Sequence, residues 1–365
     1  MHKLLQQGLV MQLSALLLGV FILPVQARVI SDLYEVVEAV PSRGSTDLAL
    51  AGSRGLERVF VRVTGDAAIG NNPNLQPVLQ KAQQFVQGYH YTSEDNQLYL
   101  HLSFDPQAVS RQVHQLGLPM WPNNRPGTLV WLAVDTLLDG RSVLREEDVP
   151  ELFSVLEAMA IERGVPLDFP VMDLNDQRNM PLGALWAQDE RAAERAGLRY
   201  SPDATLMGRI LQSSGHRWQA DWLLVHGGRS YAFDSSGGSM EETALRGINQ
   251  MANALARRYA VRPQGRDAQT GAMIVELAGV DSFADYVEAL AYLRGLAQVS
   301  STSLLSVVGD RMRIALSVSV RLSNLRDTLA LNHKLRAPAD GDTIDLSGYR
   351  APLGSADNPL RYRWD

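Results

Sequence analysis

Three histidines form the most suggestive polar cluster of the sequence. His90 and His101 flank a polar turn at residues 93–96, and His114 follows soon after. If that turn makes a tight hairpin, His90 lies opposite Tyr99, and His101 sits diagonally beside it on the same face. Two histidines on one face could ligate a metal ion, but a site needs three or four converging ligands. The pattern places only two, so we expect half-exposed strand histidines and no metal site.

No motif for catalysis or nucleotide binding occurs in the chain. The patterns G-x-S-x-G, G-x-G-x-x-G, the phosphate loop and H-E-x-x-H are absent. The chain has no cysteine, which excludes thiol catalysis, disulfides and a lipoprotein signal. Serine, aspartate and histidine are present, but a triad is recognised by geometry, and no spacing singles one out. We therefore expect no enzyme activity, no catalytic residue and no cofactor.

A further pattern points to recognition. Residues 311–320 alternate, with Met312 and the other apolar side chains on one face and Arg311 and Arg313 on the other. Arginine and aromatic residues are good interface anchors, and an exposed aromatic tail could also add a strand to a sheet edge. The alternative is that the face is solvated and the tail folds back on its own domain. The candidate partner surface comprises Arg311, Arg313, Arg321, Tyr362 and Trp364.

Two other polar groups have ordinary explanations. Trp121 and Arg125 could form a recognition patch, but we favour the interpretation that Trp121 fills a seam between domains. Four acids stand near the ends of strands and helices, where solvated or capping carboxylates are common. These are Asp173, Asp176, Asp189 and Glu190.

The first residues predict export. Lys3 precedes an apolar run at residues 13–23, which Pro24 ends before the small side chain of Ala27. This is the layout of a secretory signal peptide, and the run falls short of the roughly 20 residues of a spanning helix. We expect cleavage after Ala27, a periplasmic mature chain and no membrane span after cleavage. An uncleaved anchor is the alternative.

Charge excludes some partners. The chain carries 34 Lys+Arg against 40 Asp+Glu, for a net charge of -6. A mildly acidic surface does not favour nucleic acid or anionic lipid. Other proteins of the cell envelope, of unknown identity, are the expected partners.

Strand and helix patterns divide the rest into a multidomain chain of mixed α/β and α+β class. A small α+β domain is expected at residues 28–120, with strands near 36–40, 88–91 and 98–104 and helices at 46–60, 75–86 and from Asp105 to Gly117. A proline-rich linker follows at 121–127. A layered α/β domain with a mixed sheet is expected at 128–262, with strands at 128–134, 167–172, 204–211, 218–225 and 230–233 and helices at 150–162, 182–195 and from Ser239 to Tyr259.

The last third predicts a smaller unit. After a linker at 263–270, residues 271–335 have the order β-α-β-β-α, which we interpret as an open-faced sandwich. Its first helix, at 282–293, has Phe283, Val287 and Leu290 on one face, and its last helix is expected at 325–331. The composition then favours a flexible tail at 336–365.

Several short segments resemble a known family. They are VRVTGD at 61–66, NRP at 124–126 with LVWLA at 129–133, LMGR at 206–209, WQADWL at 218–223 and LARRYAV at 255–261. Together they resemble an uncharacterised family of exported proteobacterial proteins, the domain of unknown function 2066. That resemblance implies a Gram-negative cell envelope and supplies no functional residues.

We therefore expect an uncharacterised, secreted, non-enzymatic protein that acts by protein–protein binding in the cell envelope. One alternative is a periplasmic solute- or glycan-fragment-binding protein, whose cleft would lie at the carboxyl ends of strands 130–134 and 204–209. A second alternative is an enzyme without a recognisable motif.

Overall fold

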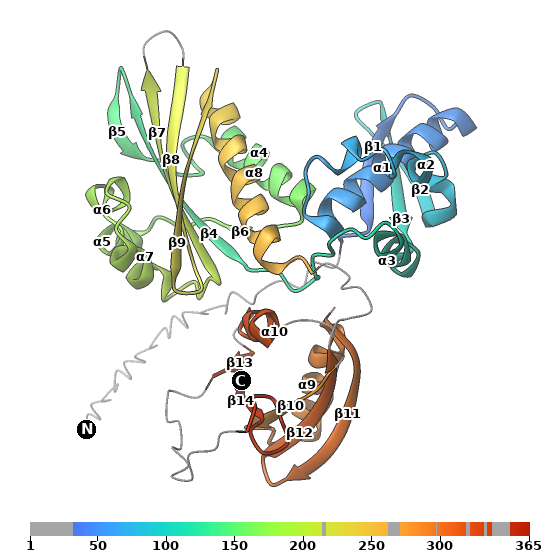
Figure 1. Cartoon of the computed structure of the whole chain (residues 1–365). Helices are drawn as coiled ribbons and strands as arrows, with labels where there is room; N and C mark the ends of the chain where they lie inside the picture. The colour runs from blue at the N-terminus through green and yellow to red at the C-terminus, as the bar shows by residue number, and fades with distance from the viewer. Residues whose placement is uncertain are drawn as a thin grey trace, which may run out of the picture.

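The chain forms three separate sheets, each with its own hydrophobic core, in a mixed α/β architecture (Figure 1). The computed structural model describes residues 32–213, 217–261, 271–296, 298–318, 322–331, 334–337 and 351–365. The leader expected at 1–27, the linker expected at 263–270 and Arg321 lie outside the described residues. The predicted fold class is confirmed.

The N-terminal sheet has three strands in the order β1-β3-β2. Its elements are β1 (Glu35–Val40), α1 (Ser45–Thr64), η1 (Ile69–Asn71), α2 (Gln76–Leu79), η2 (Ala82–Phe85), β2 (Val86–Glu94), β3 (Gln97–Phe104) and α3 (Pro106–Gln115). Helix α1 packs closely on the sheet, because Gly55 leaves room for Leu102 and Phe104. Asp105 caps α3 as predicted, by accepting a hydrogen bond from the Gln107 backbone N–H.

The single helix predicted at 75–86 is wrong. The segment divides into α2 and the 3₁₀ turn η2, and β2 begins at Val86. Ala82 and Phe85 are both buried, and their spacing of three residues fits the 3₁₀ repeat better than an α-helix.

The middle sheet has the order β5-β4-β7-β8-β9, with β6 paired to β4. Its elements are β4 (Thr128–Thr136), β5 (Gly140–Val143), α4 (Pro150–Arg163), β6 (Leu167–Asp168), α5 (Leu174–Asn179), α6 (Leu182–Trp186), α7 (Glu190–Gly197), β7 (Ala204–Ser213), β8 (Arg217–His226), β9 (Arg229–Gly237) and α8 (Met240–Tyr259). Strands β4 and β7 are parallel, whereas β8 and β9 are antiparallel to their neighbours, so the mixed sheet is confirmed. Helices α4 and α8 cover one face, and α5, α6 and α7 cover the other (Figure 1).

Two predictions for this sheet are wrong in extent. The strand predicted at 167–172 shrinks to β6, since Pro170 lacks the backbone N–H that a ladder needs. The helix predicted at 182–195 breaks into α6 and α7, because Gln188 has a φ of 53° and Asp189 starts the second helix as its N-cap. Strand β5 was not predicted.

The C-terminal sheet has five strands in the order β11-β12-β10-β14-β13. Its elements are β10 (Gly271–Ala278), α9 (Phe283–Gly295), β11 (Val299–Val308), β12 (Arg311–Val318), α10 (Leu322–Leu329), β13 (Leu335–Arg336) and β14 (Leu360–Trp364). The predicted alternation of β12 holds, because Met312, Ile314, Leu316 and Val318 are all fully buried. The predicted apolar face of helix α9 is only partly buried, because Leu290 is buried but Phe283 and Val287 are exposed.

The chain end is part of this sheet and not an exposed tail. Strand β14 pairs in parallel with β10 and antiparallel with β13. Tyr362 and Trp364 are buried in the core of the domain, at 7% and 6% exposure. The tail therefore folds back on its own domain, which was the alternative, and the hypothesis that Tyr362 and Trp364 meet a partner is wrong, since apolar side chains at alternate positions bury themselves on the core face.

Candidate functional site

The open face of the C-terminal sheet gathers arginines from two strands. Arg311 and Arg313 stand on β12, and Arg361 and Arg363 stand on β14; all four side chains are exposed. Glu276 on β10 lies between the two pairs, since it is the register partner of both Arg313 and Arg361. We call these five residues the arginine face.

Ion pairs connect the arginine face across three strands. The Glu276 carboxylate lies 2.6 Å from Nε of Arg313 and 3.7 Å from both Nη1 of Arg311 and Nε of Arg361. Four guanidinium groups and one carboxylate leave a net charge of +3 on this face. Glu276 is 7% exposed, whereas the four arginine side chains are exposed, so the accessible charge of this face is mainly positive.

This face contains two of the five residues that the sequence singled out. Arg311 and Arg313 lie on it as predicted, Arg321 is outside the described residues, and Tyr362 and Trp364 point to the opposite, buried side. Sequence reasoning missed Glu276, Arg361 and Arg363. The alternation in the last residues, Leu360-Arg361-Tyr362-Arg363-Trp364, matches the pattern of β12 and could have revealed them.

Trp121 and Arg125 lie in the seam between the first two sheets, as we favoured. Trp121 is 1% exposed and Arg125 is fully buried, with its guanidinium 4.2 Å from the centroid of the Trp121 ring. The Arg125 guanidinium donates to backbone carbonyls of Trp121 and of four other residues, Arg62, Pro122, Arg163 and Gly164. Burial lowers the pKa of Arg125 to about 9. A side chain enclosed in this way holds the seam and offers nothing to a partner.

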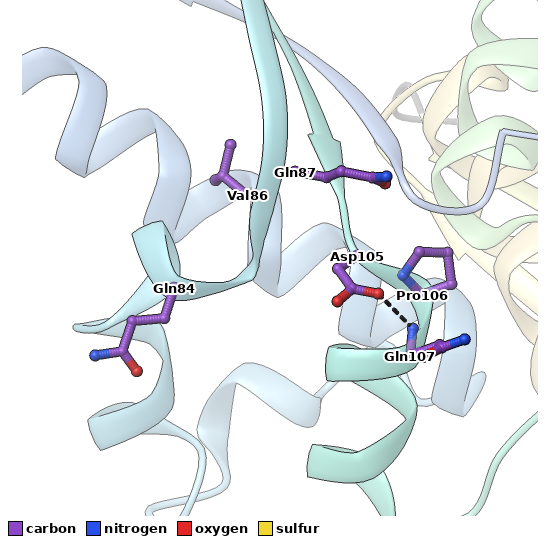
Figure 2. Close-up of a pocket in the computed structure, with 6 residues that line it drawn as sticks. All are labelled: Gln84, Val86, Gln87, Asp105, Pro106 and Gln107. Carbon is purple, nitrogen blue, oxygen red and sulfur yellow. Dashed lines mark hydrogen bonds between the residues drawn. The ribbon is translucent and has the colours of Figure 1, made fainter.

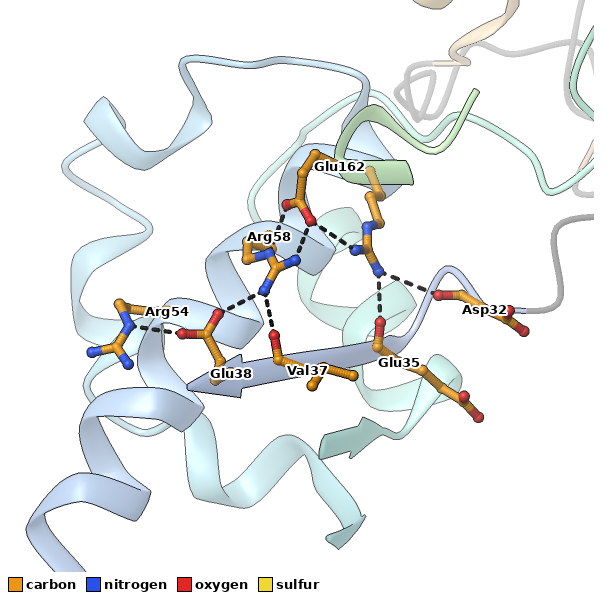
Figure 3. A network of polar contacts seen from close by, with 8 residues as sticks. Asp32, Glu35, Val37, Glu38, Arg54, Arg58 and Glu162 are labelled. Carbon is orange, nitrogen blue, oxygen red and sulfur yellow. Dashed lines mark hydrogen bonds and ion pairs between the residues drawn. The ribbon is translucent and has the colours of Figure 1, made fainter. Parts of the chain in front are cut away.

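A second polar network ties helix α4 to the N-terminal sheet. Glu162 accepts hydrogen bonds from Arg58, which also donates to Glu38 and to the Val37 carbonyl (Figure 3). Burial raises the pKa of Glu162, but the hydrogen bonds and charges of Arg58 and Arg62 outweigh it, and the net shift is downward. The network is structural, because its donors and acceptors are used between the two domains.

The histidines adopt a different register from the one predicted. His90 pairs directly with His101, and Tyr99 lies opposite Thr92. The two imidazole rings stack with centroids 4.4 Å apart, and His101 Nε2 lies 2.9 Å from the Thr92 hydroxyl. Stacked parallel rings do not aim their nitrogens at one point, and the described residues hold no group of three or more His, Cys, Asp or Glu that could bind a metal. The predicted register fails because the turn is tighter than we assumed: β2 and β3 continue to Glu94 and Gln97.

The acids of the middle domain divide between capping and burial. Asp173 and Asp189 are N-caps of α5 and α7, in agreement with the capping interpretation. Asp176 is instead fully buried, where it accepts hydrogen bonds from the Met172 N–H and the Tyr200 hydroxyl. Burial, and then the bond to Asp176, raise the pKa of Tyr200 to about 12. This pair anchors the loop before α5.

The hollows of the described residues include two of several hundred Å³. Amide side chains line the first, about 540 Å³, where Gln84, Gln87 and Gln107 surround the Asp105 cap of α3 (Figure 2). The second, about 380 Å³, lies at the amino end of β7 beside Asp203 and His226. The cleft that we expected for a solute binder was at the carboxyl end of that strand.

Comparison with known proteins identifies one domain. A family described as a domain of unknown function (DUF8605) matches residues 27–122, the region of the N-terminal sheet. No curated protein matches the chain. Within the part of the chain that the structure describes, no helix is both long and apolar enough to cross a membrane.

Proposed function

We propose that this chain is a non-enzymatic protein of the cell envelope, and that it binds an acidic surface of another protein through the arginine face. The observation that supports this most directly is that three exposed arginines, Arg311, Arg313 and Arg361, share the single carboxylate of Glu276. Arg363 is exposed beside them on β14. Guanidinium groups bind carboxylates through paired hydrogen bonds, and arginine is enriched at interfaces.

The arrangement of the arginines suits an extended or flat acidic partner. Side chains at alternate positions of one strand are about 7 Å apart, and neighbouring strands are about 4.8 Å apart. The arginines of β12 and β14 are separated by β10, so they form two parallel rows on a firm backbone. A sheet holds such rows without the entropy loss that flexible loops suffer on binding.

The proposed location follows from the leader. Residues 1–27 have the layout of a cleavable signal peptide, so the mature chain would begin after Ala27 in the periplasm. The resemblance to an exported proteobacterial family, the domain of unknown function 2066, is consistent with this location.

A solute- or glycan-fragment-binding role is the second candidate. The hollow beside Asp203 and His226 favours it, because it offers a space of about 380 Å³ with both apolar and polar side chains in its lining. An enzyme with a site of scattered carboxylates is a third candidate, and no cluster of residues described above favours it.

Photo-crosslinking in living cells tests the main proposal. A photoreactive residue in place of Ser317, on β12 of the arginine face, should yield a discrete adduct with another envelope protein. The variant Arg311→Gln with Arg363→Gln should lose that adduct, while the 2.6 Å pair between Arg313 and Glu276 stays intact. We avoid Arg313→Glu because it would set a second carboxylate against Glu276.

The matched control is Arg191→Gln with Arg195→Gln, two exposed arginines of helix α7. This control changes the net charge equally and should keep the adduct. The proposal is wrong if the control and the arginine-face variant keep every wild-type adduct. A rise of several degrees in melting temperature with a small glycan or solute, in the absence of any protein adduct, would favour the second candidate.

A further inference from the structure

Strand β11 leaves one edge of the C-terminal sheet open. It ends the strand order β11-β12-β10-β14-β13 in the described residues. Its sequence, VSSTSLLSVV, contains no charged residue. The other edge strands described in the three sheets, β1, β2, β5, β6, β9 and β13, each carry at least one charge. Charges on edge strands prevent unwanted pairing, so β11 is the edge without this protection.

Apolar side chains are exposed along the same edge. Leu304 and Val307 are exposed to 42% and 49%, although they lie opposite Ile314 and Met312 on the helix side of the sheet. A bulge between Leu304 and Ser306 adds Leu305, which is half exposed. Edge residues on the core side are normally covered, so this strand is incompletely covered by its own domain.

Helix α9 extends this apolar surface. It runs beside β11, where Nε of Arg294 donates to the Thr302 hydroxyl over 3.0 Å. Phe283 and Val287, spaced one helical turn apart, are exposed to 79% and 47%. The exposed side chains of α9 and the edge of β11 therefore lie beside each other on the helix side of the sheet.

We propose that this edge, with the exposed side chains of α9, is the interface with a second copy of the chain, formed by antiparallel pairing of β11 with β11 of the partner copy. Two five-stranded sheets would then join into one continuous sheet of ten strands. The twofold axis would pass between the two β11 strands. Such an interface uses the same residues of both copies, so each backbone contact is made twice. The same axis brings the two α9 helices side by side and covers Phe283 and Val287 of both copies.

Charge supports a second copy as the occupant. An uncharged strand meets its own image without repulsion, whereas like charges directly opposite each other are destabilising. The arginines of the arginine face that lie nearest to this edge, on β12, would be separated from their images by three strand spacings of about 4.8 Å, or about 14 Å, which exceeds the Debye length of about 8 Å. The arginine faces therefore remain open, and the dimer presents two of them.

Analytical ultracentrifugation of the purified protein, produced from the full 365-residue chain, tests the proposal. The wild type should sediment as a concentration-dependent dimer. Leu304→Lys with Val307→Lys should weaken the dimer at least about tenfold, because the lysines of the two copies face one another across the axis. The control, Val37→Lys with Tyr89→Lys, places two lysines at exposed positions of β1 and β2 and should dimerise like the wild type. A wild type that stays monomeric at every concentration overturns the proposal, as does a dimer that both variants retain equally.

Cysteine crosslinking keeps the test decisive if the lysine variant fails to fold. The chain has no cysteine, so a single introduced thiol reports its own neighbour. Ser301→Cys, Ser303→Cys and Ser306→Cys, made one at a time, sample one face of β11. One of them should form a disulfide dimer rapidly under mild oxidation, because only a position near the axis brings the two Cβ atoms to about 4 Å. Ser142→Cys on the edge strand β5 is the control, and equal slow crosslinking at all four positions would refute pairing through β11.

Discussion

His226 shows how burial selects one protonation state at a single residue. Its Nδ1 lies 2.6 Å from the Asp203 carbonyl, and its Nε2 contacts the Tyr259 hydroxyl. Because a carbonyl only accepts, Nδ1 carries the proton, and Nε2 accepts from Tyr259. Burial lowers the pKa of His226, and burial also raises the pKa of Tyr259. Both shifts favour the neutral pair, which joins strand β8 to helix α8.

The neutral histidine predicts a loss of stability in mild acid. The folded pKa lies below the unfolded value of about 6.5, so the unfolded chain takes up a proton first as the pH falls. The contribution of neutral His226 to the free energy of unfolding is therefore complete above pH 6.5 and is lost below it. The free energy of unfolding then falls by at most about 1.4 kcal/mol per pH unit. Urea unfolding between pH 7 and 5 should show this slope in the wild type.

The variant His226→Gln should unfold more easily at pH 7 and with a shallower pH dependence. His114→Gln, on the exposed surface of α3, is the matched control and should follow the wild type. Parallel slopes for wild type and His226→Gln would show that this histidine does not set the acid sensitivity.

Among the elements, β7, β8 and α8 meet at one tryptophan. Trp222 of β8 is fully buried and donates through Nε1 to the Ser235 hydroxyl. Gly208 of β7 and Gly247 of α8 contact opposite parts of its indole, and a Cβ at either position would overlap the ring. Neither glycine has a positive φ, so close approach is what these positions require. The close packing of helix α8 on the sheet therefore depends on glycine, which has no Cβ, at both positions.

Gly247→Ala should destabilise the protein by about 1–3 kcal/mol through overpacking. This loss would outweigh the gain of up to about 1 kcal/mol that alanine normally brings inside a helix. Gly183→Ala is the matched control, because Gly183 lies in helix α6 with nothing within 4 Å of its added Cβ. It should stabilise by about 0.5–1 kcal/mol. Thermal and urea unfolding of both variants decide between the two effects, and equal stability changes would contradict the packing argument.

The terminal strand β14 is a second element whose role is measurable. It lies between β10 and β13, and Leu360, Tyr362 and Trp364 are buried in the core. Deletion of residues 360–365 should therefore unfold the C-terminal domain, which limited proteolysis within residues 271–331 would reveal. Trp364→Ala, expected to destabilise by about 3–5 kcal/mol, gives a milder test, and a protease-resistant deletion variant would contradict the topology.

The sequence predicted strand β12 but not the pairing of strand β14, and the difference has a physical reason. Strand β12 has eight residues and a complete alternation, so its buried face could be predicted from local pattern. Strand β14 has the same alternation in five residues, but its parallel pairing with β10 connects segments distant in the sequence. Glu276 was missed for the same reason, since only the register across three strands brings it to Arg313 and Arg361. The split between α6 and α7 depends on one left-handed residue, Gln188.

At the scale of the whole molecule, buried arginines hold the first two domains together. Arg62 of α1 donates to the Glu162 carboxylate of α4 over 3.5 Å, and Arg163 of α4 donates to the Gly65 carbonyl over 2.8 Å. Burial lowers the pKa of Arg62, and it lowers that of Arg163 to about 10. Carbonyl oxygens accept hydrogen bonds from most of the guanidinium N–H groups. The guanidinium groups therefore fix the positions of the backbone segments that they join. The N-terminal and middle domains should therefore move as one body.

The C-terminal domain is joined to this body by fewer polar contacts. Asn124 of the linker donates to the Thr328 carbonyl over 3.2 Å, and Arg258 of α8 pairs with Asp327 over 3.3 Å. Both partners lie on helix α10, on the side of the domain away from β11 in Figure 1. Asn124 also hydrogen-bonds the side chain of Tyr292 on α9, and none of these three contacts involves a residue of β11 or of the arginine face.

The contact between the first two domains can be tested at Glu162. Glu162 is the carboxylate that faces Arg58 and Arg62 across the seam, with Nε of Arg58 at 2.6 Å. Glu162→Gln should lower the free energy of unfolding by about 1–3 kcal/mol, since a charged hydrogen-bond acceptor is lost beside partly buried arginines. The lowered pKa of Glu162 means that this contribution is complete above about pH 4.5 and disappears as the pH falls toward the folded pKa. The variant should therefore differ from the wild type in stability at pH 7 and converge with it in acid.

Limited proteolysis reports the loosened joint directly, because residues 118–127 should be cleaved faster in Glu162→Gln. Glu157→Gln, exposed on the same helix, is the control, and a seam that opens equally in both variants would show that this ion pair does not hold the two domains together.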